Sequence, residues 1–285
     1  MNQKLLVIGA NGLVGKVCTP ILKEKYKFDL MTPTSEELDI TDKASVETFV
    51  ANAEVTTILL LAANTDVDGA EKDGGIEARR VNVEGTKNVA EASKKYSKHL
   101  IYISTDFVFS GSEDNKGPYS VTSKTENIDS KLIGEYAKSK LMGEIAVKES
   151  GCQFMIVRIS YPFGNPNSEK DFANKTIKLI KSGYGLFTDQ KFSPTYIPDL
   201  ADAVSKIVQN NLTGVCHVVC SSVTTPHEFG QYLSDKLGLG EVKQSLLKEF
   251  MVGRTPKPLF GGLVASKELV DRNWKEAVDN FVSET

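Results

Sequence analysis

The sequence has few of the residues that build metal centres or disulfide frameworks. It contains four cysteines and three histidines among 285 residues, and neither set has the close spacing typical of zinc sites or redox disulfides. Cys216 and Cys220, for example, lie four residues apart in an apolar stretch, where buried reduced thiols are common. We therefore expect no metal site and a cytoplasmic protein with reduced thiols.

Long hydrophobic runs and concentrated positive charge are also missing. The longest apolar run, Ile58–Ala63, is far shorter than the roughly 20 residues that span a bilayer. The formal net charge is -3 and the lysines and arginines are spread along the chain, whereas nucleic-acid binding requires a concentrated basic face. We therefore expect neither a membrane nor a nucleic acid as partner.

What the sequence does contain is the alternation of an α/β fold. Hydrophobic residues make up 40% and charged residues 25%, which is ordinary for a globular protein. Short, near-continuous apolar runs separate stretches of helical periodicity, which indicates a parallel sheet buried on both faces. The expected strands are 4–10, 26–32, 56–63, 99–104 and 154–160, and the expected helices between them include 42–53 and 79–95. We predict a Rossmann-like doubly wound parallel sheet.

The alternation loosens after about Tyr161, where prolines interrupt the chain. A helix is expected at 171–181, and another is framed by an N-cap at Thr225, a capping box with Glu228 and a terminating Gly238. We expect residues 1–160 to form a dinucleotide-binding domain and residues 161–285 a smaller, mostly helical substrate-binding domain. A segment near 185–210 is expected to return to the first domain.

Three glycines follow the first expected strand at a spacing that has chemical meaning. Gly9, Gly12 and Gly15 stand in a strand-to-helix turn, where backbone N–H groups and the positive helix end attract a phosphate. Gly9 would allow the tight turn, Gly12 the approach of a pyrophosphate, and Gly15 the packing of the helix on the sheet. A purely structural turn is the alternative, but the position directly after a strand favours dinucleotide binding.

Tyr136 and Lys140 are four residues apart and are expected on one face of a helix. A free phenol, with a pKa near ~10, is a poor acid or base at neutral pH, and a neighbouring ammonium should lower that pKa. Thr105 ends the preceding strand, where ligands bind in α/β sheets, and its hydroxyl can hold a carbonyl oxygen that gains charge. Chance spacing of the pair and a capping role for Thr105 are the alternatives.

These elements together resemble the dTDP-4-dehydrorhamnose reductase family of the extended short-chain dehydrogenase/reductase superfamily. The resemblance covers about the first 240 residues. Besides the glycine turn and the Tyr136/Lys140 pair, it rests on Asn82 and on the stretches Ala62–Glu71, Ser104–Phe109, Arg158–Gly164, Asp171–Ile180 and Thr188–Val204.

The resemblance implies an NAD(P)H-dependent reductase of a nucleotide-diphospho-4-keto-6-deoxysugar in polysaccharide biosynthesis, acting as a monomer or homodimer. The nicotinamide would give a hydride to the keto carbon, Tyr136 a proton to the oxygen held by Thr105, and Lys140 would also bind the nicotinamide ribose. The implied cofactor-binding residues are Gly9, Asn11, Gly12, Leu13, Val14, Gly15, Thr32, Asp39, Ile40, Ala62, Ala63, Asn64, Thr65, Ile103, Tyr136 and Lys140. The implied substrate-binding residues are Thr65, Val67, Thr105, Asp106, Phe107, Tyr136 and Tyr161.

The choice between NADP and NAD is open in the sequence. Residues 30–35, after the second expected strand, offer neither an acid for the ribose hydroxyl nor a base for the extra phosphate. The small hydroxyls around Thr32, and Lys16 just beyond the glycine turn, favour NADP.

Two segments depart from the family's pattern. The stretch between Thr105 and Tyr136, which borders the sugar in this family, is longer than the resemblance leads us to expect, so the nucleotide and the sugar stay open. The second is Arg254–Leu263, which is only loosely similar to the family's Arg-Pro closing motif, and Arg254 there is either a diphosphate contact or a solvated loop residue.

Two other functions are compatible with the same motifs. One is a non-catalytic dinucleotide-binding regulatory subunit, similar to the one that regulates methionine adenosyltransferase. The other is a sugar-nucleotide epimerase or dehydratase. The intact Thr105, Tyr136 and Lys140 favour catalysis, and Phe107 stands where dehydratases commonly carry a second acid.

Overall fold

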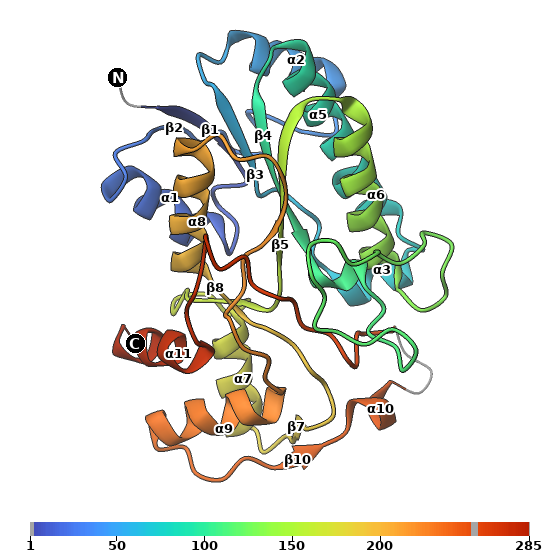
Figure 1. Ribbon diagram of the computed structural model, residues 1–285, viewed down its shortest axis with the longest axis vertical. Coiled ribbons are helices and arrows are strands. Elements are labelled where there is room, and N and C mark those ends of the chain that lie inside the picture. The colour runs from blue at the N-terminus through green and yellow to red at the C-terminus, as the bar shows by residue number, and fades with distance from the viewer. Residues whose placement is uncertain (1–2, 252–255, 285) are drawn as a thin grey trace.

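The computed structural model describes residues 3–251 and 256–284 (Figure 1). At the centre of this part of the chain lies a six-stranded sheet with the order β2-β1-β3-β4-β5-β9, in which every neighbouring pair is parallel. The strands are β1 (Lys4–Ile8), β2 (Asp29–Met31), β3 (Thr57–Leu60), β4 (His99–Thr105), β5 (Gln153–Ile159) and β9 (Gly214–His217). The strand order changes direction between β1 and β3, which is where ligands bind in such sheets. The predicted doubly wound fold is confirmed.

Both faces of the sheet are covered by helices. Successive residues of a strand point to opposite sides, and the strands are apolar on both sides, so each face is buried. Leu5 and Val7 of β1 belong to one hydrophobic cluster, and Leu6 and Ile8 to another on the opposite face. Figure 1 shows the helices that cover the two faces, which are α1 (Gly15–Glu24) and α8 (Ile197–Gln209) on one, and α2 (Lys43–Asn52), α5 (Thr86–Lys95) and α6 (Glu135–Ser150) on the other. The sheet is therefore the buried centre that fixes the positions of its strand ends.

The second strand is shorter than predicted. The sequence suggested 26–32, but β2 spans only Asp29–Met31, with exposed or half-buried residues. It is an edge strand that pairs with β1 alone, and Lys27 turns the chain just before it with a φ of 59°. An edge strand lacks a second neighbour that would extend its ladder.

The helix expected at 79–95 is interrupted near its start. The chain forms α3 (Val67–Lys72) and α4 (Ile76–Arg79), then a π-helical turn at Arg80–Gly85, and only then α5. π-helical turns are rare and occur frequently at functional sites. The buried side chain inside this turn is Asn82, which is 1% exposed.

The second part of the chain lies below the sheet in Figure 1 and has its own aromatic core. Its helices are α7 (Phe172–Lys181), α9 (Pro226–Leu237), α10 (Leu247–Phe250) and α11 (Trp274–Ser283), with short strand pairs β6 (Pro162–Phe163) with β8 (Thr195–Tyr196) and β7 (Leu186–Phe187) with β10 (Gln244–Ser245). Phe163, Phe229, Trp274 and Phe281 are buried together there. The α9 helix begins with the predicted capping box at Thr225.

The chain returns from this second part to the sheet. α8 packs on the sheet in the same cluster as α1, and β9 pairs with β5 at the sheet edge. β7, in contrast, pairs with β10 in the second part. The division into residues 1–160 and 161–285 stays a prediction, and the elements that rejoin the sheet lie at residues 197–217.

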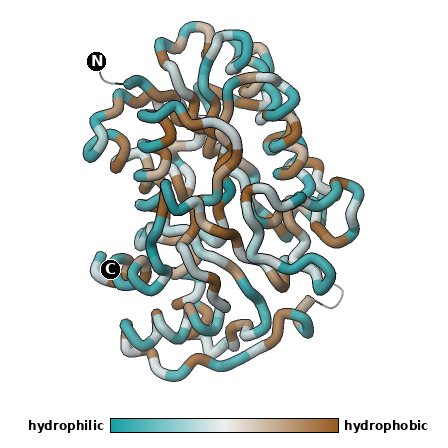
Figure 2. The backbone as a smooth tube through the Cα atoms, in the orientation of Figure 1, coloured by the Kyte–Doolittle hydropathy of each residue, from teal (hydrophilic) through white to brown (hydrophobic). Residues whose placement is uncertain are grey.

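The hydropathy colouring in Figure 2 shows hydrophobic stretches along the central strands and hydrophilic ones at outer turns. None of the helices in the described part of the chain combines the length and apolar character of a membrane span. Within residues 3–251 and 256–284, no three His, Cys, Asp or Glu side chains are grouped to hold a metal ion. All four cysteines are buried with free thiols.

Candidate active site

The turn from β1 to α1 requires glycine at two positions. Gly9 has a φ of 94°, and a Cβ there would lie 2.5 Å from the backbone nitrogen of Ala62. A Cβ on Gly15 would lie 2.5 Å from the carbonyl oxygens of Gly9 and Ala10. The first glycine therefore lets β1 approach the end of β3, and the last lets α1 start directly on the turn.

The outer side of this turn is open to a ligand. Asn11 and Gly12 are exposed, and Leu13 and Val14 are half-buried. In the described chain no side chain caps the N-terminus of α1. The N–H groups of Lys16 and Val17 already bond the carbonyls of Gly12 and Val14, so an anion would meet the N–H groups that precede them in the turn. The turn has the shape and the donors that a pyrophosphate needs.

Residues 62–65 follow β3 and lie beside the glycine turn. The backbone N–H of Ala62 donates to the Ile8 carbonyl at 3.0 Å. Asn64 is held from the other side, because its N–H donates to the Asn82 side-chain oxygen at 2.8 Å and its carbonyl accepts from the Asn82 amide at 2.9 Å. The expected cofactor stretch is therefore fixed between β1 and the π-helical turn.

Asn82 also connects this stretch to the helix that carries the Tyr–Lys pair. Its amide donates to the Ser139 hydroxyl at 2.9 Å, and that hydroxyl donates to the carbonyl of Tyr136 at 2.7 Å. The sequence suggested Asn82 only as part of a resemblance, because its hydrogen-bond partners lie far away in the chain. The π-helical turn places its amide where both neighbours can be reached.

Lys140 is buried against the end of β4. Its Nζ donates to the carbonyl of Ile103 at 2.8 Å and lies 4.2 Å from the centre of the Tyr102 ring. Burial lowers the pKa of Lys140 to about 7, against a smaller opposing effect of the Glu144 carboxylate. An amine that gains and loses a proton near neutrality is typical of functional sites.

Tyr136 faces Thr105, but its acidity differs from the sequence-based expectation. Burial raises the pKa of Tyr136, the Asp106 charge raises it further, and a hydrogen bond with Thr105 opposes them. The expected lowering of this pKa by Lys140 is therefore wrong for the protein alone. The Lys140 ammonium is directed at Ile103 and Tyr102 instead.

Thr105 ends β4, and its hydroxyl accepts a hydrogen bond from the N–H of Phe107 at 3.3 Å. It therefore caps the short turn at 106–108, which was the structural alternative, and it also reaches Tyr136. Phe107 packs against Tyr136 and Tyr161, with ring centres 6.0 and 6.2 Å apart. The structure thus brings four predicted site residues, Thr105, Phe107, Tyr136 and Tyr161, into one cluster.

Tyr161 has an unusual backbone conformation. Its φ of 42° lies in the left-handed region, which is uncommon for a bulky residue and is found most often at binding sites and switches. Its hydroxyl accepts a hydrogen bond from Gln190 at 2.7 Å, and its ring packs on Phe192 at 4.6 Å. The aromatic core of the second part of the chain therefore holds this ring beside Phe107.

The remaining predicted residues lie farther along the sheet edge. Met31 pairs with Leu6, so Thr32 emerges at the same edge as the glycine turn. The Asp39 carboxylate accepts from the Thr41 backbone and hydroxyl, and Ile40 is buried. Within the described residues no hydrogen bond or ion pair joins these three to the cluster around Tyr136, whereas Thr65 and Val67 follow Asn64 directly. Arg254 lies outside the described residues.

A buried ion pair joins β5 to α6 next to the cluster of Thr105, Phe107, Tyr136 and Tyr161. Arg158 on β5 makes two hydrogen bonds of 2.8 Å to the Glu144 carboxylate on α6, which also accepts from Ser104 at 2.7 Å. Glu144 and Arg158 are 0% and 2% exposed. Ser104 precedes Thr105, and Glu144 lies one helical turn beyond Lys140, so this pair links the two elements that carry the predicted trio.

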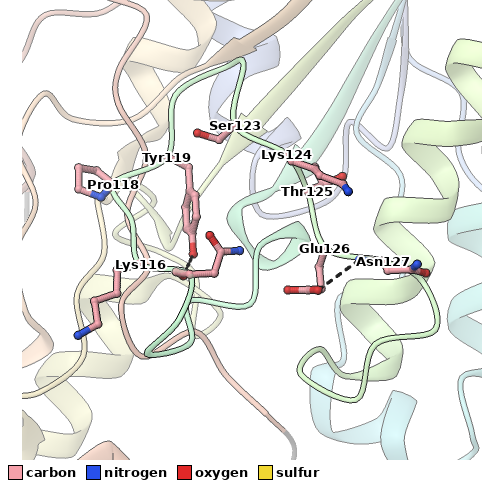
Figure 3. A pocket seen from close by; sticks show the side chains of 9 residues that line it. Lys116, Pro118, Tyr119, Ser123, Lys124, Thr125, Glu126 and Asn127 are labelled. Carbon is pink, nitrogen blue, oxygen red and sulfur yellow. Dashed lines mark hydrogen bonds between the residues drawn. The ribbon is translucent and has the colours of Figure 1, made fainter.

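The long segment between Thr105 and Tyr136 forms a cavity of its own. It has a volume of about 500 Å³ and is lined by Asn115, Lys116, Pro118, Tyr119, Ser123, Lys124, Thr125, Glu126 and Asn127 (Figure 3). The Tyr119 ring stacks on Phe109 at 4.0 Å, which anchors the segment. None of the predicted site residues lines this cavity.

A glycine turn at the switch point of a parallel sheet, with a Thr–Tyr–Lys cluster at the end of β4, defines an extended short-chain dehydrogenase/reductase. The family model described as RmlD substrate binding domain matches residues 3–285. The chain belongs to the dTDP-4-dehydrorhamnose reductase family, and the resemblance seen in the sequence is confirmed.

Individual relatives agree with this assignment. The chain is 33% identical to dTDP-4-dehydrorhamnose reductase of Mycobacterium tuberculosis over 236 residues, covering 81% of this chain and 73% of the relative. It is 29% identical to the spore coat polysaccharide biosynthesis protein SpsK of Bacillus subtilis, covering 99% and 97%. The crystal structure of dTDP-4-dehydrorhamnose reductase from Bacillus anthracis in complex with NADP matches with a TM-score of 0.89 and 29% identity over 100% of both chains.

Proposed function

We propose that this protein is an NADPH-dependent reductase of a nucleotide-diphospho-4-keto-6-deoxysugar, with dTDP-4-dehydrorhamnose as the first substrate to test. The convergence of Thr105, Tyr136 and Lys140 at the switch-point edge of the sheet carries this proposal. The relatives support it, since they include dTDP-4-dehydrorhamnose reductase of Mycobacterium tuberculosis and a dTDP-4-dehydrorhamnose reductase structure in complex with NADP. We expect a cytoplasmic monomer or homodimer.

The residues present fit a dinucleotide. Gly9 and Gly15 let the turn pack tightly on β3 and on its own carbonyls, and the N-terminus of α1 is uncapped by side chains in the described chain. We assign cofactor binding to the residues predicted from the sequence, with the pyrophosphate on the turn 9–15 and the nicotinamide ribose at Lys140. The exposed Lys16 and Thr32 lie where an extra phosphate would need partners, which favours NADP.

The bound cofactor supplies a hydride to the keto carbon. This chain's own residues handle the oxygen: Tyr136 gives its phenolic proton to it, and Thr105 donates a hydrogen bond as the oxygen gains charge. The raised pKa of Tyr136 keeps the phenol protonated at neutral pH. Lys140 provides a positive charge at the end of β4 while it is protonated. Thr65, Val67, Phe107 and Tyr161 are assigned to the sugar side, and Asp106 to the same side through its hydrogen bond with Thr105.

The test is the substitution Tyr136→Phe, followed by the absorbance of the reduced nicotinamide with dTDP-, UDP- and GDP-linked 4-keto-6-deoxysugars. We expect kcat to fall by about 10² or more, the usual scale for a lost general acid, while the Kd for NADPH is unchanged. Tyr184→Phe is the matched control, because Tyr184 is 64% exposed. A near-normal rate in Tyr136→Phe would refute the proton-donor role, and a wild-type protein that reduces none of these sugars would refute the proposed function.

A further inference from the structure

Thr105 has a single proton to donate, and in the structure it points at a carboxylate. The Thr105 Oγ1 lies 3.2 Å from the Asp106 Oδ1 and accepts from the Phe107 N–H. An ionised carboxylate is only an acceptor, so the hydroxyl must donate to it. While this bond exists, Thr105 cannot donate to a carbonyl oxygen of the substrate.

Asp106 sits in an environment that disfavours its charge. It is 3% exposed, and its Oδ2 accepts from the Ser160 hydroxyl at 2.8 Å. Burial raises the pKa of Asp106 to about 6, against smaller opposing hydrogen bonds from Ser160 and Thr105. The titratable groups that sense its charge are phenols, Tyr119, Tyr136 and Tyr161, each with a pKa raised by it. In the described part of the chain no cation is among the groups that act on this carboxyl.

We propose that Asp106 is a positioning residue that determines whether the Thr105 proton reaches the substrate's carbonyl oxygen, an inference that rests on the proposed reductase function. Ionised Asp106 takes the hydrogen bond of Thr105. Protonated Asp106 donates its own O–H to the Thr105 Oγ1, which leaves the Thr105 proton for the carbonyl. Binding of the ketone therefore moves one proton from solvent onto Asp106.

This arrangement fixes the sign of a pH effect. The productive form is the protonated one, which is present below the Asp106 pKa of about 6 and is lost above it. The kcat/KM for the ketone is expected to fall by about tenfold per pH unit above that value. In Asp106→Asn the amide N–H donates to Thr105 at every pH and its oxygen still accepts from Ser160, so this step disappears. If titration of Lys140 caused the pH dependence of kcat/KM instead, that dependence would persist in Asp106→Asn.

The substitution Ser160→Ala tests the same inference while Thr105 and Asp106 themselves stay unchanged. In wild type the hydrogen bond from the Ser160 hydroxyl stabilises the ionised Asp106 carboxylate. Its removal should therefore raise the pKa of Asp106 and move the midpoint of the pH step in kcat/KM upward by roughly 0.5–1 unit. A residue that only maintains the fold would not shift this midpoint. An unchanged midpoint in Ser160→Ala overturns the inference, even if Asp106→Asn fails to fold.

The direct measurement is proton uptake on ligand binding. dTDP-4-keto-6-deoxy-D-glucose is titrated into NADP⁺-loaded protein at pH 7.5 in two buffers of different ionisation heat. Wild type and the exposed-site control Asp235→Asn should take up about one proton, and Asp106→Asn close to none. Absent uptake in wild type, or equal uptake in Asp106→Asn, overturns the inference. Intact uptake without NADPH turnover on any keto-sugar would instead refute the proposed function and leave the Asp106–Thr105 link standing.

Discussion

Lys140→Met should stabilise the ligand-free protein while it destroys activity. Burial lowers the pKa of Lys140 from 10.5 to about 7, and a difference of about 3.5 at about 1.4 kcal/mol per pKa unit corresponds to about 5 kcal/mol. Because half of the amines are already neutral at pH 7, about 4 kcal/mol of this cost applies there. The hydrogen bond to Ile103 and the contact with the Tyr102 ring together offset about 2 kcal/mol of this cost in wild type. We therefore expect a net gain of about 2 kcal/mol in the variant at pH 7.

The pH dependence of this gain distinguishes electrostatics from better packing. Between pH 7 and pH 10 the unfolded chain keeps the Lys140 proton and the folded one loses it, so the stability of wild type rises with pH. The variant lacks this contribution. The difference between the two should shrink by about 2 kcal/mol from pH 7 to pH 9, which leaves them nearly equal at pH 9.

Urea denaturation followed by circular dichroism, without cofactor, measures both quantities. Lys138→Met is the matched control on the same helix, because Lys138 is only half-buried and pairs with Glu135 at 2.9 Å. It should change stability by no more than about 0.5 kcal/mol. A Lys140→Met protein that is less stable than wild type at pH 7, or a stability difference that stays constant up to pH 9, would refute the reasoning.

Two further predictions concern the turn and the buried ion pair. Gly15→Ala places a methyl group 2.5 Å from the carbonyl oxygens of Gly9 and Ala10, so the turn must open; we expect the Kd for NADPH to rise at least tenfold by fluorescence titration, and an unchanged Kd would contradict a role of this turn in binding. Arg158→Met leaves the buried Glu144 carboxylate with only the half-exposed Lys148, at 3.4 Å, as a counter-charge, and should cost about 3 kcal/mol in urea denaturation. The double variant with Glu144→Gln should recover more than half of that loss, and equal instability of single and double variants would argue against a paired charge.

The sequence predicted the features that local patterns encode. The apolar runs of β1, β3, β4 and β5 are buried on both faces, and such strands can be recognised from composition and length alone. Gly9 and Gly15 were predicted from their spacing, and the structure shows that a side chain at either would meet backbone atoms. Each of these signals depends on neighbours within a few residues.

The features that the sequence did not predict depend on distant partners. Asn82 bonds Asn64, 18 residues away, and Ser139, 57 residues away. Glu144 meets Arg158 only because α6 packs over β5. Nothing in the neighbouring sequence distinguishes Asn82 or Glu144 from ordinary surface residues, since an asparagine or a glutamate on a helix normally faces water. Only the assembled sheet shows that both are buried and satisfied.

The acidity of Tyr136 is the clearest case in which spacing was insufficient. Four residues of separation put Lys140 on the same side of α6, yet its ammonium lies on the Ile103 carbonyl and the Tyr102 ring. Burial and the Asp106 charge then dominate and raise the pKa of the phenol. A phenol with a raised pKa stays protonated at neutral pH, but it is also a weaker acid, because giving its proton to a ketone leaves a phenolate in the same buried site. The protein alone therefore holds this proton in place without activating it, and a positive charge beside the phenolate is needed to make the transfer easier.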